Sequence, residues 1–263
     1  MTTAPALTPQ GLFFSFLEMN IEIENMKKLS ATFLEDSSTH SVLPMWQRDL
    51  LSYRASRTTG IHPWTIRESK PIRTKPSNGE YQCGGNGHHK VFGEVSAKWE
   101  IQLVRLKGKK KHYAPSLFSL NGLASTKVRI LEVRGTEEIE LARWRFEIGD
   151  SQSPGCHFHV QVLGDDNDVM FPRTLDVPRL PGIMVTPMDA LEFLLAELFQ
   201  DEWKKITSRS SDALAAWAAC QRKRLTKVLE WQQTTLSTGS GSPWTLLKIS
   251  KPDSDLLIKE SQS

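Results

Sequence analysis

A regular alternation of apolar and polar residues between positions 91 and 104 constrains the fold of this chain more than any other feature. Apolar side chains occupy every second position, at Val95, Ala97, Trp99, Ile101 and Leu103. Because successive side chains of a strand point to opposite faces, this pattern predicts a half-buried β-strand. The segments 126–133, 139–148 and 157–163 show the same period. Together they predict an antiparallel meander of about four or five strands with one covered face.

Helices are predicted on both sides of this run of strands. The segment 187–205 follows Thr186 and Pro187, a helix cap and a first-turn proline, and a second C-terminal helix is predicted over 211–236. An N-terminal helix is predicted from Thr8-Pro9 to about residue 34, where apolar residues recur at helical spacing. Strands gathered in one run and helices in others predict an α+β fold in which the C-terminal helices back the sheet.

The same patterns divide the chain into four parts. Residues 1–57 form an N-terminal helical segment, with a short second helix at 45–54, and residues 58–90 form an irregular loop. Residues 91–236 form the core domain, with the antiparallel sheet and two helices, and residues 237–263 form a linker and tail. The apolar run 244–249 in the tail is expected to dock as an edge strand or to contact a protein partner.

Composition narrows the class of protein. Apolar side chains make up 39% of the 263 residues and charged ones 24%, which excludes wholesale disorder. No apolar run reaches the roughly 18 residues of a membrane span, so no membrane association is expected. The cysteines are an odd number, Cys83, Cys156 and Cys220, and no basic region precedes the first apolar patch. A reducing, cytoplasmic location is therefore expected.

The sharpest motif for chemistry lies in residues 155–163. On a strand, His157, His159 and Gln161 share one face, and the apolar residues between them take the other. Residues 151–163 resemble the signature of the histidine-triad nucleotide hydrolases and transferases, whose transferase branch has glutamine at the third polar position. The resemblance implies that His159 attacks an α-phosphorus while His157 and Gln161 orient it or hold phosphate oxygens. The alternative is a solvated sheet face that carries two histidines.

Cationic side chains of the neighbouring strands are expected on the same face as these histidines. If Trp144 and Phe146 face the core, then Arg143 and Arg145 face outward, and Lys127 and Arg129 extend that surface. Arginines beside histidines suit the binding of phosphate, so these four cations are the predicted ligand-binding residues. The alternative is ordinary cross-strand ion pairing, with Glu100, Glu140 or Glu147 as the partners.

Two basic clusters predict contact with nucleic acid. The first is the turn with Lys107, Lys109, Lys110 and Lys111, which could contact phosphates irrespective of base sequence. The second is one side of the last helix, where Arg224, Lys227 and Trp231 could hold a single strand by charge and stacking. The alternatives are a solvated turn, and a packed tryptophan covered by the stems of basic side chains.

A zinc site is a further hypothesis. Cys83, His88 and His89 lie in a glycine-rich segment, and Cys156 with His157 could complete a tetrahedral site. The sequence contains no pair of cysteines at metal-binding spacing, so plain loop residues are favoured, and neither a metal nor a cofactor is predicted.

Two functions follow from these residues. The first is a non-catalytic binding or accessory protein that engages a phosphate-bearing ligand, a nucleic acid or nucleotide, or a protein partner. The alternative is a nucleotidyl hydrolase or transferase similar to the histidine-triad proteins, which uses His159.

Overall fold

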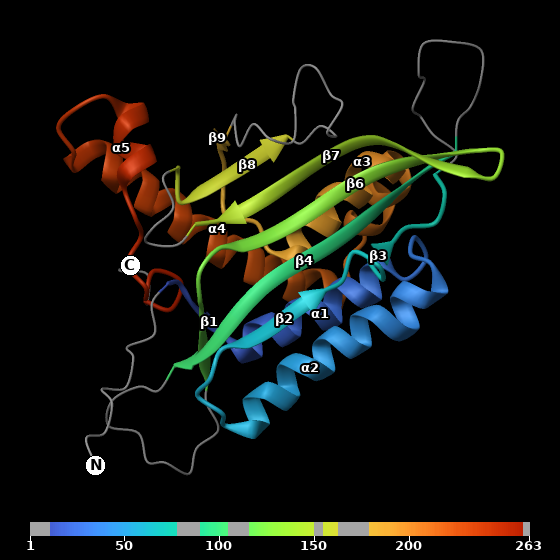
Figure 1. Ribbon diagram of the computed structural model, residues 1–263, viewed down its shortest axis with the longest axis horizontal. Coiled ribbons are helices and arrows are strands. Elements are labelled where there is room, and N and C mark those ends of the chain that lie inside the picture. Colours follow the sequence, from blue (N-terminus) through green and yellow to red (C-terminus); the bar gives the residue numbers. More distant parts are fainter. Residues whose placement is uncertain (1–10, 78–89, 105–115, 150–154, 163–178, 260–263) are drawn as a thin grey trace.

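The structure is a computed structural model that describes residues 11–77, 90–104, 116–149, 155–162 and 179–259. These residues form an α+β fold around one antiparallel sheet (Figure 1), as the sequence predicts. The sheet has nine strands rather than four or five. The strands are β1 (Phe13–Ser15), β2 (His62–Ile66), β3 (Ile72–Arg73), β4 (Val91–Val104), β5 (Leu117–Leu120), β6 (Ala124–Arg134), β7 (Glu137–Ile148), β8 (Phe158–Val162) and β9 (Arg179–Pro181).

Strand β4 is the centre of the sheet. It pairs with β2 and β3 on one side and with β5 and β6 on the other, so that Val95 has Ile72 and Val128 as its two neighbours. From β6 the sheet continues through β7 and β8 to β9, and β1 pairs with β5. The four predicted strands are therefore β4, β6, β7 and β8.

The helices gather on one face of the sheet. They are α1 (Phe16–Ser30), the short π-helix η1 (Ser38–Val42), α2 (Leu43–Ser56), α3 (Pro187–Thr207), α4 (Asp212–Thr238) and α5 (Pro243–Ile249). Figure 1 shows α1, α3 and α4 behind the sheet, with α2 alongside β2. In the described part of the chain, no helix covers the opposite face. We call that opposite face the polar face.

The core lies between the sheet and these helices. Trp99 of β4 is buried there, and Trp64 of β2 stacks on Trp46 of α2 with ring centroids 4.0 Å apart. Gly93 of β4 faces α3, and a Cβ at this position would lie 2.5 Å from a methyl carbon of Leu194. A glycine here therefore lets α3 approach β4 more closely than any other residue would.

Several predicted boundaries need correction at the N-terminal side. The first helix begins at Phe16, where the Ser15 side chain accepts a hydrogen bond from the Glu18 amide, and it ends at Ser30. The predicted cap at Thr8 lies outside the described residues. The predicted irregular loop 58–90 contains β2 and β3, because pairing with β4 buries Trp64 and gives these short segments their hydrogen bonds.

The tail also differs from its prediction as an edge strand. Residues 244–249 lie in α5, because Pro243 opens a helical turn after Ser242 and α5 packs against α4. Trp244 is 70% exposed, so the predicted contact with a protein partner stays a prediction. None of the described helices is both long and apolar enough to cross a membrane.

Candidate ligand-binding site

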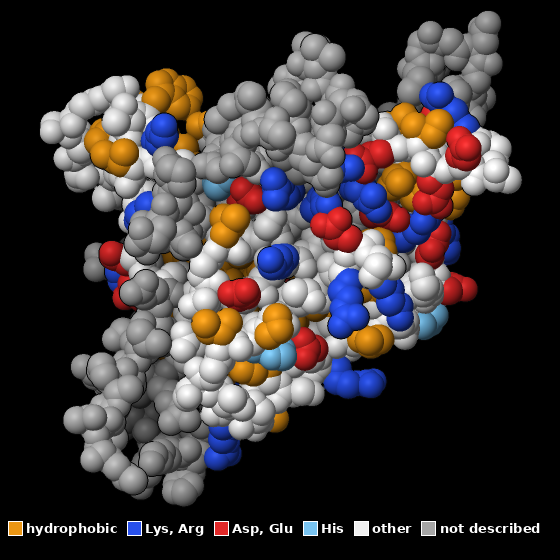
Figure 2. Space-filling model, viewed as in Figure 1, with side chains coloured by type: hydrophobic (Ala, Val, Ile, Leu, Met, Phe, Trp, Pro, Cys, Tyr) orange, Lys and Arg blue, Asp and Glu red, His pale blue; other side chains and the backbone are white. Residues whose placement is uncertain are grey.

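The register of β6, β7 and β8 brings the predicted site residues onto the polar face. Lys127 lies opposite Arg145, and Arg129 lies opposite Arg143. Across the next pair of strands, Arg145 lies opposite Gln161 and Glu147 lies opposite His159. Figure 2 shows Lys and Arg side chains intermixed with Asp and Glu over this face of the sheet.

His159 is buried in a hydrogen-bonded pair rather than exposed to solvent. Its Nε2 lies 2.8 Å from a carboxylate oxygen of Glu147, and its Nδ1 lies 2.8 Å from the carbonyl oxygen of Cys156. Both neighbours are acceptors, and both ring nitrogens of His159 are engaged in these contacts. An attack on phosphorus would first require one of these hydrogen bonds to break.

Glu147 connects the imidazole to the cations of the polar face. Burial acts to raise the pKa of Glu147, but the hydrogen bond from His159 and the charge of Arg145 lower it below its ordinary value. The Arg145 guanidinium also donates to the side-chain oxygen of Gln161 at 3.0 Å. His157 is buried as well, with its ring packed edge-on against Phe158. The expectation of a solvated face at these histidines is therefore wrong.

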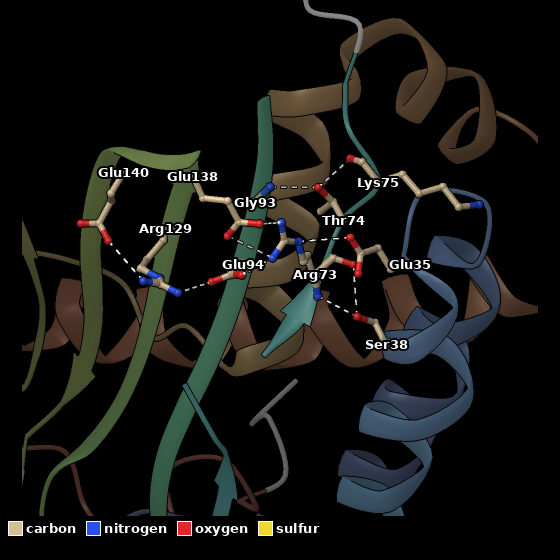
Figure 3. A network of polar contacts seen from close by, with 10 residues as sticks. All are labelled: Glu35, Ser38, Arg73, Thr74, Lys75, Gly93, Glu94, Arg129, Glu138 and Glu140. Carbon is tan, nitrogen blue, oxygen red and sulfur yellow. Dashed lines mark hydrogen bonds and ion pairs between the residues drawn. The ribbon is translucent and has the colours of Figure 1, made fainter. Parts of the chain in front are cut away.

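A ladder of ion pairs crosses the polar face from β3 to β7 (Figure 3). Glu94 of β4 is buried between Arg73 and Arg129, and Arg129 also contacts Glu140. Arg143 pairs with the same Glu140 at 2.6 Å. The cross-strand ion pairing considered for Arg129 and Arg143 is thus present, and the charges of these two predicted ligand-binding residues are matched within the sheet.

Next to this ladder lies a pocket of about 850 Å³, here called the polar pocket. Residues of β2, β4, β6 and β7, of the segment after β2 and of the turn before β6 line it. Its cationic side chains are Arg67, Lys98, Lys127, Arg143 and Arg145, and its carboxylates are Glu68, Glu100 and Glu147. Hydroxyl groups of Thr65, Ser69, Ser96 and Ser125 and the amide of Asn121 complete the polar lining.

The charges of the polar pocket are matched only in part. Lys127 pairs with Glu68 at 2.5 Å, and this contact lowers the pKa of Glu68. Arg145 lies 3.6 Å from Glu147. Among the described residues, neither Arg67 nor Lys98 has an ion-pair partner. The pocket therefore has a surplus of positive charge.

Sequence reasoning missed Arg67 and Lys98 for different reasons. Lys98 lies on the predicted outer face of its strand, so the alternation in 91–104 could have identified it. Arg67 follows a five-residue strand inside a segment that the sequence predicts as irregular, and no pattern points to it.

The residues of α4 that were predicted to contact nucleic acid pack against other parts of the protein. Arg224 is buried against Glu22 and Asp189, with 2.9 Å between Arg224 and Asp189. Lys227 is buried and donates to the carbonyl oxygens of Leu257 and Lys259. Trp231 packs edge-on against Phe158. Arg224 and Lys227 stabilise the packing of α4 and are not available to a nucleic acid in this structure, and Trp231 is half-buried.

Other predicted residues cannot be placed. Lys107, Lys109, Lys110 and Lys111 lie outside the described residues, as do Cys83, His88 and His89 of the zinc hypothesis. Within the described ranges, no group of three or more His, Cys, Asp or Glu side chains is arranged to hold a metal ion.

Comparison of the chain with models of protein families, with curated proteins and with solved structures finds no match in any of the three.

Proposed function

We propose that this chain is a binding protein whose polar pocket takes a phosphate-bearing ligand of nucleotide size. The observation that carries the proposal is the charge of the pocket. Apart from Arg143, which pairs with Glu140, four cationic side chains line it against three carboxylates. The volume of about 850 Å³ lies within the roughly 300–1,000 Å³ that is usual for small-molecule sites.

Lys98 and Arg67 are the proposed phosphate contacts, because neither has an ion-pair partner in the part of the chain that the structure describes. Arg145 supplies a third cation, and its hydrogen bond to Gln161 holds the guanidinium in place before a ligand arrives. A fixed guanidinium can present two parallel N–H donors to phosphate oxygens, while lysine acts as a point charge. The hydroxyl groups and Asn121 would serve the uncharged part of the ligand.

A nucleotide is favoured over a nucleic acid strand for a structural reason. Arg67 and Lys98, which have no ion-pair partner among the described residues, lie in one pocket. Of the predicted strand-binding residues of α4, Arg224 and Lys227 are buried and Trp231 is half-buried. The cytoplasmic location expected from the cysteines belongs to the same proposal, since nucleotides are abundant there.

Calorimetric titration with the four ribonucleoside triphosphates and the matching nucleosides tests this function. We expect at least one triphosphate to bind, with an affinity that falls as salt rises, and its nucleoside to bind far more weakly. Lys98→Gln should weaken binding about tenfold, since it removes one charge-assisted hydrogen bond. Lys204→Gln, at an exposed lysine of α3, is the matched control and should change nothing. Nucleosides that bind as tightly as their triphosphates would overturn the proposal. Binding of a single-stranded oligonucleotide alone would also overturn it and would favour a nucleic-acid-binding function.

The alternative function of a nucleotidyl hydrolase or transferase has less support, because both ring nitrogens of His159 are engaged. Turnover of nucleoside phosphoramidates or dinucleoside polyphosphates by the wild type, lost in His159→Ala at unchanged fold, would favour this alternative over simple binding.

A further inference from the structure

A second pocket lies on the opposite side of β7, between the sheet and α3. We call it the apolar groove, and its volume is about 860 Å³. Trp144 and Phe146 of β7 and Val160 of β8 form one wall, and Phe193 of α3 and Ile183 stand on the other side. The Phe193 ring meets both β7 aromatic rings edge-on, 6.2 Å from Trp144 and 6.3 Å from Phe146, and its side chain is 46% exposed. Aromatic walls with a half-exposed ring suit a flat, apolar ligand body.

The groove ends at polar side chains of α3 and α4. Asp189 and Glu192 of α3 and Gln221 of α4 line this end. Asp189 accepts hydrogen bonds from the Thr186 amide at 2.8 Å and from Arg224 at 2.9 Å. Glu192 accepts one from the indole nitrogen of Trp217 at 2.9 Å. Both carboxylates are thus fixed in position beside an apolar space.

Negative charge is in surplus at this end. Arg224 is the cation in contact with Asp189, and it also pairs with Glu22 of α1. One guanidinium therefore pairs with two carboxylates, those of Glu22 and Asp189, and Glu192 adds a third negative charge near Asp189. At the rim, Glu197 of α3 and Arg143 of β7 add one charge of each sign.

The environment makes this surplus unfavourable in the absence of a ligand. Burial, together with the nearby charge of Glu192, raises the pKa of Asp189 to about 7. Burial also raises the pKa of Glu192. A cation placed between the two carboxylates would stabilise their ionised forms, because opposite charge favours ionisation while burial and like charge oppose it.

We propose that the apolar groove binds a small amphipathic molecule with an aromatic or other apolar body and a protonated amine, the amine lying between Asp189 and Glu192. The apolar body would cover the β7 aromatic rings and Phe193. The proposal does not depend on the polar pocket, since the two sites use opposite faces of β7 and share Arg143 alone at their border.

Three probes of one size and different charge test this inference: 1-naphthylmethylamine, 1-naphthylmethanol and 1-naphthoate. At about pH 8, where the pKa of Asp189 leaves its carboxyl mostly ionised, titration should give the order amine, alcohol, carboxylate. We expect the amine to bind about tenfold tighter than the alcohol, the size of one charge-assisted contact. Equal affinity for the three probes, or no binding of the amine, would overturn the proposal.

Glu192→Gln separates the charge of the groove from its shape. Glutamine keeps an acceptor for Trp217, so the fold should persist, while the amine should lose about tenfold in affinity and the alcohol should be unaffected. Glu230→Gln, at an exposed position of α4, is the matched control. Ile183→Ser, at a half-exposed position of the wall, should weaken all three probes to a similar degree. An amine affinity that is unchanged in Glu192→Gln would show that the amine lies elsewhere.

Discussion

Asp189 serves two purposes at the level of a single residue. As the third residue of α3 it exchanges hydrogen bonds with Thr186, the predicted helix cap, and so closes a capping box. The same carboxyl group also lines the apolar groove and contacts Arg224. Its raised pKa follows from burial, which cannot be deduced from the capping pattern alone.

This raised pKa gives a prediction for the dependence of stability on pH. A folded state in which Asp189 has a pKa of about 7, against an ordinary 3.8, binds a proton more tightly than the unfolded state. The contribution of this group to the free energy of unfolding is therefore greatest below about pH 4 and decreases as the pH rises to about 7. Asparagine does not titrate, so Asp189→Asn removes this contribution. Between about pH 4 and pH 7, the free energy of unfolding measured with urea should therefore decrease less, or increase more, in the variant than in the wild type.

Asp201→Asn, at an exposed position of α3, is the control and should keep the wild-type profile. Parallel profiles for Asp189→Asn and the wild type would mean that Asp189 titrates normally.

Residues of the polar face illustrate which features the sequence could reveal. Alternation alone predicts that Arg145, Glu147 and His159 share a face, and the register agrees. The burial of His159 depends on its hydrogen bonds to Glu147 and Cys156, and no local pattern encodes these contacts. Arg224 shows the same limit, because its partner Glu22 is some two hundred positions earlier in the chain.

At the level of elements, long segments with a clear period were predictable and short ones were not. Strand β4 and helices α3 and α4 contain enough residues for their period to stand out. Strands β1, β3 and β9 have two or three residues, so their extended conformation comes from pairing with a longer neighbour. Helix α5 has the serine and proline of a helix start, a signal that the sequence reasoning did not use.

The packing of α3 on β4 gives a prediction at this level. Gly93→Ala should destabilise the protein by about 1–3 kcal/mol, because the added methyl group would overlap the side chain of Leu194. Urea unfolding followed by circular dichroism measures the change. Gly60→Ala, where the nearest atom to an added Cβ would be a methyl carbon of Thr58 at 4.0 Å, is the control and should stay within about 0.5 kcal/mol of the wild type. Equal stability of the two variants would mean that α3 can move away from β4 without loss.

At the level of the whole molecule, contacts distant in sequence join the N-terminal segment, the core and the tail. Apolar residues of α1, such as Phe16 and Ile23, belong to the same core cluster as Trp99 and Leu195. The amide of Phe13 donates to the carbonyl oxygen of Ser254 at 2.7 Å. Lys227 of α4 donates to two carbonyl oxygens of the tail, at Leu257 and Lys259.

The Lys227 contacts predict how the tail is fixed. Lys227→Met keeps an apolar stem of similar length but removes the donor from both carbonyl oxygens, of which the Leu257 contact is buried, at an expected loss of about 1–3 kcal/mol. Hydrogen exchange of the backbone amides in 253–259 should become faster, while amides of β4 should change only with global stability. Arg222→Met, at an exposed position of the same helix, is the control. Unchanged exchange in the tail of Lys227→Met would show that other contacts fix it.

Strand β7 acts as a shared wall. Trp144 lines the apolar groove and its neighbour Arg145 lines the polar pocket, so that a single peptide bond joins the two sites. A sliding of this strand along its own axis would displace a proposed phosphate contact and an aromatic surface by equal amounts. Binding of an anion on one side of β7 would then change the affinity of the other side for an amine.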